Sequence, residues 1–252
     1  MNGYESRIPG PQNALDIFTG DWTSALPLPE GAGLVAGQAL LFADPRVDWA
    51  LAALGGVAGA RVLELGPLEG GHSYMLERAG AREVIAIEGN RGAFLRCLVL
   101  KEILGLTRVR YVCGDFNPYL RETDETFDVV FATGVLYHQL DPMQMLSDIA
   151  RLAPAVYLWT HYYDAASPSL SGKIGPLRRL EFQGRSYSRG EFRYMQALAW
   201  SGFCGGSQPQ AHWLPRTDIL DALQAFGYRD VSVAFDDPDH PNGPCVAIVA
   251  RR

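Results

Sequence analysis

The sequence lacks the features of a membrane-spanning or secreted protein. No apolar run approaches the roughly 18 residues that a membrane helix requires, and residues 1–6 lack the basic-then-apolar order of a signal peptide. The cysteines are few and scattered, without the pair spacing of metal ligands: Cys97, Cys113, Cys204 and Cys245. Because Cys97 and Cys113 lie in apolar stretches, we expect both thiols to be buried. These absences predict a cytoplasmic protein with no membrane partner.

Basic residues are fewer than acidic ones: 22 Lys and Arg against 28 Asp and Glu give a net charge of −6. Tight binding to nucleic acid needs a basic surface for the phosphates, so a nucleic-acid partner is disfavoured, although a local basic groove is not excluded. The content of 48% hydrophobic and 20% charged residues is ordinary for a globular protein. The 252 residues suffice for one large domain, or for a core with a modest insertion.

Short apolar strands alternate with helical patterns along the middle of the chain. Strands are expected at 61–65, 83–88, 108–113, 127–132 and 155–160, and helices at 45–54, 71–79, 91–104 and 142–152. This order predicts an α/β fold with a mostly parallel sheet and helices on both faces. A helix at 217–226 and strands at 228–235 and 245–250 follow. The link 236–244 is too short for a parallel crossover, so the last two strands should pair antiparallel.

Two segments depart from this pattern. Residues 1–43, rich in Gly and Pro, predict an irregular N-terminal arm or lid, followed by a main domain over 44–252. Residues 161–214 separate a strand from its crossover helix, and insertions of this length commonly carry function. We interpret this insertion as a substrate cap, and an interface in a homodimer is the alternative. It is rich in aromatic residues and in arginine: Tyr162, Tyr163, Phe182, Tyr187, Phe192, Tyr194, Trp200, Phe203 and Trp213, with Arg178, Arg179, Arg185, Arg189 and Arg193.

Acidic residues stand at the ends of the first three predicted strands. In an open parallel sheet, ligands bind beyond the carboxyl ends of the strands. Glu64 lies in a buried strand, where a carboxylate needs a cationic or hydrogen-bonding partner. Glu88 can accept from two ribose hydroxyls, and Asp115 can accept from an adenine amino group beside the ring face of Phe116. These acids suit a neutral or cationic nucleoside and would repel a pyrophosphate.

These motifs, in this order, resemble those of the class I S-adenosylmethionine-dependent methyltransferases. They are Glu64-x-Gly66 with Gly70, Glu88, Gly114-Asp115, and residues 127–130 leading to 134–142. The resemblance implies a Rossmann-like sheet with an antiparallel C-terminal strand, and S-adenosylmethionine as cofactor. It further implies that Glu64 and Gly66 contact the methionyl part, Glu88 the ribose and Asp115 the adenine.

The predicted cofactor site is completed by neighbours of these motifs: Pro67, Gly114, Phe116 and Thr133. One position departs from the family, because Leu68 stands where its Gly-x-Gly-x-Gly loop has the middle glycine. The detailed path of this loop is therefore an open question for the structure.

Histidines near the ends of the fourth and fifth strands are the candidate catalytic bases, because imidazole titrates near neutrality. His161 directly follows strand five, and His138 precedes the helix that Asp141-Pro142 begins. A family-typical structural role for His138 is the alternative. The candidate substrate contacts are Trp22, Tyr137, Tyr162 and Tyr163. No metal site is predicted, although His161, His138 and Asp164 together could hold a divalent ion.

Methylation of a small-molecule acceptor is the leading functional hypothesis, with O-methylation first and N-methylation next. Displacement at a sulfonium methyl needs positioning and sometimes a base, which agrees with the absence of a nucleophile triad. The stretch 134–138 is also similar to the enzymes that carboxymethylate the wobble uridine of tRNA. A non-catalytic S-adenosylmethionine-binding protein is a further alternative. A nicotinamide oxidoreductase is disfavoured, because Gly-x-Gly-x-x-Gly is absent.

Overall fold

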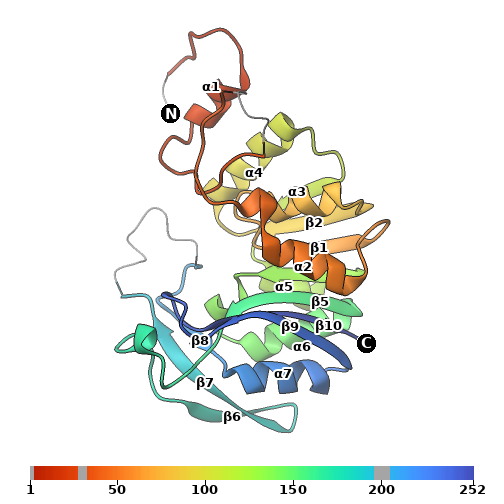
Figure 1. Cartoon of the computed structure of the whole chain (residues 1–252), viewed down its shortest axis with the longest axis vertical. Coiled ribbons are helices and arrows are strands. Elements are labelled where there is room, and N and C mark those ends of the chain that lie inside the picture. Colours follow the sequence, from red (N-terminus) through yellow and green to blue (C-terminus); the bar gives the residue numbers. More distant parts are fainter. Residues whose placement is uncertain (1–2, 28–32, 196–204) are drawn as a thin grey trace.

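Seven strands form one sheet in the computed structural model, which describes residues 3–27, 33–195 and 205–252 (Figure 1). Trp200, Phe203 and Cys204 lie outside the described residues. The strands of this sheet are β1 (Arg61–Leu65), β2 (Glu83–Glu88), β3 (Val109–Cys113), β4 (Val129–Thr133), β5 (Ala155–His161), β9 (Asp230–Asp237) and β10 (Cys245–Arg251).

The strand order is β3-β2-β1-β4-β5-β10-β9. Strands β1 to β5 are parallel, whereas β10 runs antiparallel to both of its neighbours, β5 and β9. The predicted antiparallel pairing of the last two strands is confirmed, and the reversed strand lies one place in from the edge. The order changes direction between β1 and β4, and ligands of such sheets bind beyond the carboxyl ends of the strands at this point.

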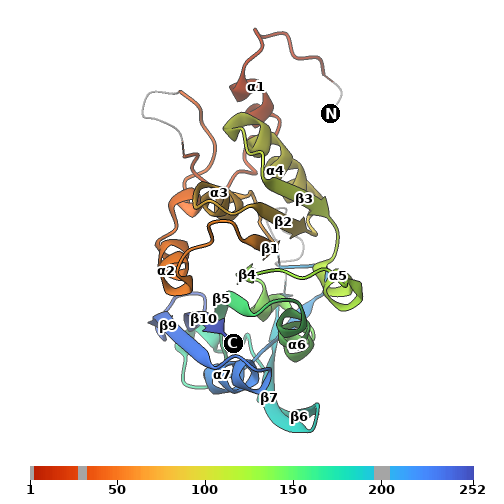
Figure 2. The same ribbon diagram turned by 90° about the vertical axis from the view of Figure 1, so that its right-hand side faces the viewer.

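Helices cover both faces of the sheet, so α2 and α5 lie on opposite sides of the strands in Figure 2. Alternate residues of β1 face opposite layers: Val62 packs with α2, α3 and α4, and Leu63 packs with α5, α6 and α7. The helices are α2 (Pro45–Leu54), α3 (Gly71–Arg78), α4 (Arg91–Leu104), α5 (Phe116–Glu122), α6 (Pro142–Leu152) and α7 (Arg216–Ala225).

Side-chain caps fix where several of these helices begin. Asp44 accepts a hydrogen bond from the N–H of Arg46, and Pro45 occupies the first turn of α2, as its sequence predicts. Asn90 caps α4 and Asp141 caps α6 in the same way. No helix in the described part of the chain combines the length and the apolar character that crossing a membrane would take.

The N-terminal arm is more ordered than its composition suggests. It contains α1 (Pro11–Asp16) and the short helix η1 (Leu41–Ala43), and a bridge joins Ser24 to Ala39. Leu15 and Phe42 bury their side chains against Leu100 of α4. Figure 1 shows the arm beside α4, at the opposite end of the molecule from the insertion.

The insertion between β5 and α7 contains a second sheet that the sequence patterns did not predict. Its three antiparallel strands are β6 (Arg178–Phe182), β7 (Arg185–Arg193) and β8 (Gln210–Trp213), preceded by the short helix η3 (Pro168–Leu170). Tyr187 is buried in the main core, and Leu180 packs against it. This sheet therefore packs on the same side of the large sheet as α6 and α7.

One local expectation needs correction, and one helix was not expected. Cys97 is buried as predicted, but Cys113 is exposed. The prediction for Cys113 is wrong because β3 is the edge strand of the sheet and Cys113 is its last residue, beyond the cover of the helices. The helix α5 was also not predicted, because seven residues with a proline inside them carry no clear periodicity.

Candidate active site

The loop from β1 to α3 takes the path of a glycine-rich turn although one glycine is replaced. Gly66, Leu68 and Gly70 all adopt positive φ, at +67°, +58° and +81°. For a leucine this conformation costs roughly 1–2 kcal/mol. The N–H of Leu68 donates to Oε2 of Glu88 at 3.0 Å, and its carbonyl accepts from the Cys97 thiol at 3.4 Å. These two contacts hold Leu68 in the conformation that glycine adopts freely.

Both glycines of this loop are required by close neighbours as well as by φ. A Cβ on Gly66 would lie 2.7 Å from Cγ1 of Val135, and a Cβ on Gly70 would lie 2.1 Å from the hydroxyl of Tyr111. Pro67 is buried and its carbonyl accepts from the N–H of Gly70 at 2.8 Å. The loop is thus a tight cradle, and its Gly66 end touches the segment that follows β4.

Glu64 is a carboxylate buried within the sheet, with 3% of its surface exposed. The hydroxyl of Ser73, in the first turn of α3, donates to its Oε2. Burial raises the pKa of Glu64 above its ordinary value. No ion pair to Glu64 is found within the described residues, so a cationic ligand beside the loop would stabilise the charged form.

Glu88 ends β2 and uses each of its carboxylate oxygens once. Oε1 accepts from the N–H of Asn90 at 2.7 Å, and Oε2 accepts from the N–H of Leu68 at 3.0 Å. Burial raises the pKa of this carboxyl group as well. A carboxylate oxygen can accept two hydrogen bonds, so each oxygen can still receive one ligand hydroxyl.

Asp115 is brought to the same edge, because the N–H of Gly114 donates to the carbonyl of Glu88 at 3.0 Å. Its carboxylate is exposed and caps α5 by accepting from the N–H of Asn117 at 2.8 Å. Phe116 is partly buried against the core beside it. The three acidic residues predicted from the strand ends therefore lie along one edge of the sheet.

Thr133 ends β4, the strand next to β1, and carries a buried hydroxyl with no hydrogen-bond partner among the described residues. A buried polar group without a partner costs free energy, so this position fits a ligand that supplies the missing bond. Glu64, the two loop glycines, Glu88 and Thr133 together fit S-adenosylmethionine, which carries a cationic methionyl end and a ribose.

Glu69, inside the same loop, was missed by the sequence analysis. Its carboxylate is buried and accepts from the backbone N–H groups of Thr23 at 2.9 Å and Ser24 at 2.8 Å. The Arg96 guanidinium of α4 lies 3.2 Å from it. Glu69 thereby joins the arm to the loop. No periodicity points to this role, because its partners lie more than forty residues away in the chain.

Trp22 lies in the arm close to these contacts. Its Nε1 donates to the carbonyl of Leu15 at 2.8 Å, and the ring packs with the arm residues that contact α4. The Arg96 guanidinium lies 6.0 Å from the ring centre. This placement is that of an anchor for the arm.

An aromatic cluster continues the site beyond β4 and β5. We define it as Tyr137, Trp159, His161, Trp213 and His240. The His161 ring stacks on Trp213, with ring centres 5.3 Å apart. It makes T-shaped contacts with Tyr137 and Trp159, whose ring centres lie 4.6 Å and 5.1 Å from that of His161. Its residues come from β5, from β8, from the turn before β10 and from the segment after β4. The cluster adjoins the loop between β1 and α3, called the cofactor loop below. The connection is Val135, which contacts Gly66 and precedes Tyr137 by two residues.

The protonation of His161 is fixed by the backbone. Its Nδ1 lies 2.8 Å from the carbonyl oxygen of Gly243, which can only accept, so Nδ1 carries the proton and Nε2 carries the lone pair. Burial lowers the pKa of His161 to about 4, and the imidazole is neutral at physiological pH. A neutral imidazole with a fixed tautomer can accept a proton at Nε2.

Two further residues predicted for the site, His138 and Tyr162, lie near this cluster but have different partners. His138 contacts Tyr194, with 2.5 Å between its Nδ1 and the phenol oxygen, and burial lowers the pKa of His138 to about 3. Tyr162 is buried in the main core and donates to Asp236 at 3.2 Å, so it faces away from His161 along the strand.

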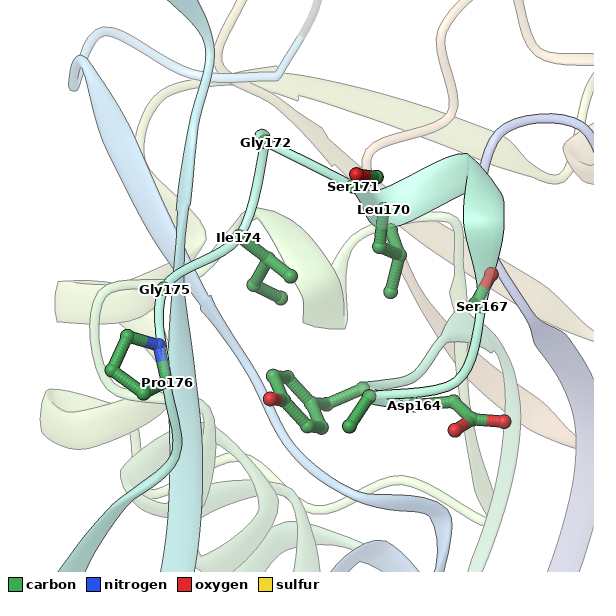
Figure 3. Close-up of a pocket in the computed structure, with 10 residues that line it drawn as sticks. Asp164, Ser167, Leu170, Ser171, Gly172, Ile174, Gly175 and Pro176 are labelled. Atoms are coloured by element: carbon green, nitrogen blue, oxygen red, sulfur yellow. The ribbon is translucent and has the colours of Figure 1, made fainter.

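Tyr163 lines a separate cavity of about 180 Å³ beyond the end of β5. Leu170 and Ile174 point into this cavity, and Asp164 lies at its border (Figure 3). The Asp164 carboxylate accepts from the N–H of Ala166 at 2.9 Å. The divalent-ion set considered from the sequence, His161 with His138 and Asp164, is thus not the set that the structure brings together.

Comparison with known proteins agrees with this geometry. Residues 63–155 match the family model described as a methyltransferase domain. Over 96% of its length the chain is similar to the N-terminal domain of EvdMO1, solved in the presence of SAH and D-fucose, with 26% identity, a TM-score of 0.71 and 94% of that domain covered. Residues 63–155 are thus a class I S-adenosylmethionine-dependent methyltransferase domain, and the chain as a whole has the fold of that class. The predicted family, sheet and cofactor are therefore confirmed.

Other methyltransferases extend the comparison. The tRNA U34 carboxymethyltransferase of Marinobacter nauticus is 32% identical over 205 residues, which make up 75% of this chain and 57% of that protein. This methyltransferase chain thus spans less than two thirds of the length of that curated relative. A methyltransferase from Mesorhizobium loti is 17% identical with a TM-score of 0.58, over 84% of this chain and all 100% of the other, and shows the shared fold.

Proposed function

We propose that this methyltransferase transfers a methyl group to a hydroxyl of a small polar acceptor, with a sugar as the best fit. The observation that carries the proposal is His161, a neutral imidazole of fixed tautomer set among aromatic rings beside the cofactor loop. Aromatic walls with a few placed polar groups are typical of small-molecule sites, and the C–H face of a sugar packs well on such rings. The similar EvdMO1 domain, solved in the presence of D-fucose, supports a sugar.

The cofactor would be held by the residues along the strand ends. Glu64 would face the cationic methionyl part, Glu88 the ribose hydroxyls, and Asp115 with Phe116 the adenine, while Gly66 and Gly70 let the backbone approach. Thr133 would supply a hydroxyl at the border between cofactor and acceptor. When bound, S-adenosylmethionine supplies an electrophilic methyl group on sulfur.

The chain's own contribution to the chemistry is positioning and proton transfer. The acceptor oxygen would gain the methyl carbon as the methyl–sulfur bond breaks and S-adenosylhomocysteine leaves, and Nε2 of His161 would receive the proton of the acceptor hydroxyl. The carbonyl of Gly243 keeps the opposite nitrogen protonated and stabilises the resulting imidazolium. Trp213, stacked on His161 at an interplanar angle of 8°, holds the ring in place. Tyr137 and His138 would line the acceptor site.

A second candidate is carboxymethyl transfer to the wobble uridine of tRNA, which the relative in Marinobacter nauticus supports by its name. Exposed arginines on β6 and β7 could form a local basic surface for RNA: Arg178, Arg179 and Arg185. The net charge of −6 and the partial coverage of that relative favour the first candidate.

Formation of S-adenosylhomocysteine, measured with purified protein, S-adenosylmethionine and either a panel of deoxysugars or tRNA, tests the proposal. We expect turnover with a sugar, and we expect His161→Gln to lower kcat by roughly 10²–10⁴-fold without changing S-adenosylhomocysteine affinity in calorimetry. His212→Gln, outside the cluster, is the matched control. Turnover with tRNA alone would establish the second candidate, and cofactor binding without any turnover would indicate a non-catalytic protein.

A further inference from the structure

Three potential metal ligands meet at the C-terminal ends of β5 and β9, where the turn into β10 closes. His161 ends β5, Cys245 begins β10 directly opposite it in the antiparallel ladder, and His240 lies in the turn between β9 and β10. Each residue offers one ligand atom, and these atoms all lie within 4.8 Å of one another. The sequence does not suggest this grouping, because His161 is about eighty residues from the other two.

His161 has the hydrogen bond that metal-binding histidines usually make. Its Nδ1–H donates to the carbonyl of Gly243 at 2.8 Å, with the carbonyl of Pro244 at 3.3 Å. A ligating histidine almost always donates its second ring N–H to a carbonyl or carboxylate, which fixes the ring and raises the basicity of the ligating nitrogen. The residues that orient His161 directly precede Cys245, so one turn positions two ligands together.

The other two ligands suit the same ion. Cys245 is buried, with 4% of its surface exposed, which protects a metal–thiolate bond from water. His240 is partly exposed, its Nδ1 accepts from the N–H of Asn242 at 3.2 Å, and its ring lies 5.2 Å from that of His161. We propose that His161, His240 and Cys245 form a binding site for a divalent transition-metal ion of the zinc type.

Ligand chemistry and spacing both favour zinc over magnesium or calcium. Two imidazoles and one thiolate are soft or borderline ligands, whereas magnesium and calcium take oxygen ligands. Ligand atoms of a tetrahedral zinc site lie about 3.3–3.6 Å apart, from bond lengths of about 2.0–2.3 Å. The ligand atoms lie within 4.8 Å of one another, so side-chain adjustments of about 1 Å bring them into this range. Three protein ligands leave a fourth position for water or for an acceptor oxygen.

The charges around the three ligands do not oppose a cation. The positive charge of Arg46 acts on both His161 and Cys245, but its guanidinium is paired with Asp44 at 2.5 Å. Asp237 lies opposite Cys245 in the β9–β10 ladder and supplies negative charge beside the thiol. A divalent ion with one bound thiolate therefore meets an environment of nearly balanced charge.

The metal site can exist whether or not the proposed methyl transfer is correct, but the two would use the same atom. Nε2 of His161 would donate its lone pair to the metal, and it is also the proton acceptor proposed above. A bound zinc ion therefore occupies the base, and we expect saturating zinc to lower turnover while the affinity for S-adenosylhomocysteine is unchanged.

Titration of the metal-free full chain with cobalt(II) tests the site without measuring turnover. We expect one equivalent of cobalt to produce ligand-field bands of a tetrahedral ion and a near-ultraviolet thiolate-to-cobalt charge-transfer band. Cys245→Ser, a near-isosteric change, should remove the charge-transfer band, and His240→Ala should weaken cobalt binding at least tenfold. Cys113→Ser is the matched control and should leave the spectrum unchanged. Cys113 is exposed, and its strand β3 lies at the opposite edge of the sheet from β10 and β9.

Absence of the charge-transfer band in the wild-type protein, or its persistence in Cys245→Ser, would overturn the proposal. Failure of the proposed function is seen separately. If the chain binds cobalt through Cys245 but methylates no acceptor, the metal site is supported and the methyl-transfer proposal is refuted. If bound zinc does not affect turnover, the metal site is supported and the assignment of His161 as the base is refuted.

Discussion

Replacement of Glu69 by alanine should release the N-terminal arm from the cofactor loop. The Glu69 carboxylate is buried and accepts two backbone hydrogen bonds from the arm, from Thr23 and Ser24, with Arg96 at 3.2 Å. In the alanine variant the two N–H groups and the guanidinium lose their shared partner. The perturbation therefore acts on the arm and on the loop between Gly66 and Gly70 at the same time.

The size of the effect follows from these contacts. Hydrogen bonds to a charged group contribute about 1.5–3 kcal/mol each, and breaking a buried charge pair by removing one partner costs about 3–5 kcal/mol. Because the three contacts share one carboxylate, they act as one unit, and we expect a total of about 3–5 kcal/mol. This free energy corresponds to a fall of about 10²–10⁴-fold in the exchange protection of the Thr23 and Ser24 amides.

Hydrogen exchange followed by mass spectrometry measures this protection directly, and chemical denaturation measures how much of the loss reaches global unfolding. Glu69→Gln keeps the shape and one acceptor oxygen, so its effect should lie between those of Glu69→Ala and the wild type. Glu102→Ala, on the exposed side of α4, is the control and should change the free energy of unfolding by less than about 0.5 kcal/mol.

The reasoning is refuted if the Glu69→Ala protein keeps wild-type protection at Thr23 and Ser24 together with a wild-type denaturation midpoint. Lower affinity for S-adenosylhomocysteine in the same variant would show that the arm contact also fixes the cofactor loop. Equal affinity with lost protection would confine the role of Glu69 to the arm.

Two further predictions concern the strand ends and the buried imidazole. Glu88→Ala and Asp115→Ala should each weaken S-adenosylhomocysteine binding by about 1–3 kcal/mol, the scale of a charge-assisted hydrogen bond, and calorimetry showing wild-type affinity in both would contradict their assignment. Burial lowers the pKa of His138 to about 3 in the folded chain. Between about pH 3 and 6.5, His138 is therefore protonated in the unfolded chain and neutral in the folded one. Stability should therefore fall by up to about 1.4 kcal/mol per pH unit as the pH drops from about 6.5 toward 3. His138→Gln should reduce this slope by one proton in urea unfolding, and an unchanged slope would count against the buried neutral imidazole.

The local patterns of the sequence were enough to predict the large sheet. Apolar runs such as 83–88 give a strand whose two faces are both buried, and Asp44-Pro45 starts a helix where a cap and a fixed φ coincide. The short link before β10 excludes a crossover and so fixes its antiparallel direction. Glu64, Glu88 and Asp115 could be placed at one edge because parallel strands end on the same side.

Other features depend on partners that are distant in the chain, and local patterns do not show them. The sheet of the insertion is held by pairing such as that of β7 with β8, whose residues carry no regular alternation. Cys113 is exposed because β3 is at the edge, which is a property of strand order. Leu68 keeps the path of the loop only because Glu88 and Cys97 hold its backbone.

The parallel α/β sheet, the strand-end acids and the cofactor class could be predicted from the sequence, because they depend on periodicity and on short-range order along the chain. Three features became visible only in the folded chain: the attachment of the arm through Glu69, the ring nitrogen of His161 that carries the lone pair, and the position of His240 and Cys245 beside it. Each of these depends on a contact between segments separated by dozens of residues, and the sequence carries no local signal for such a contact.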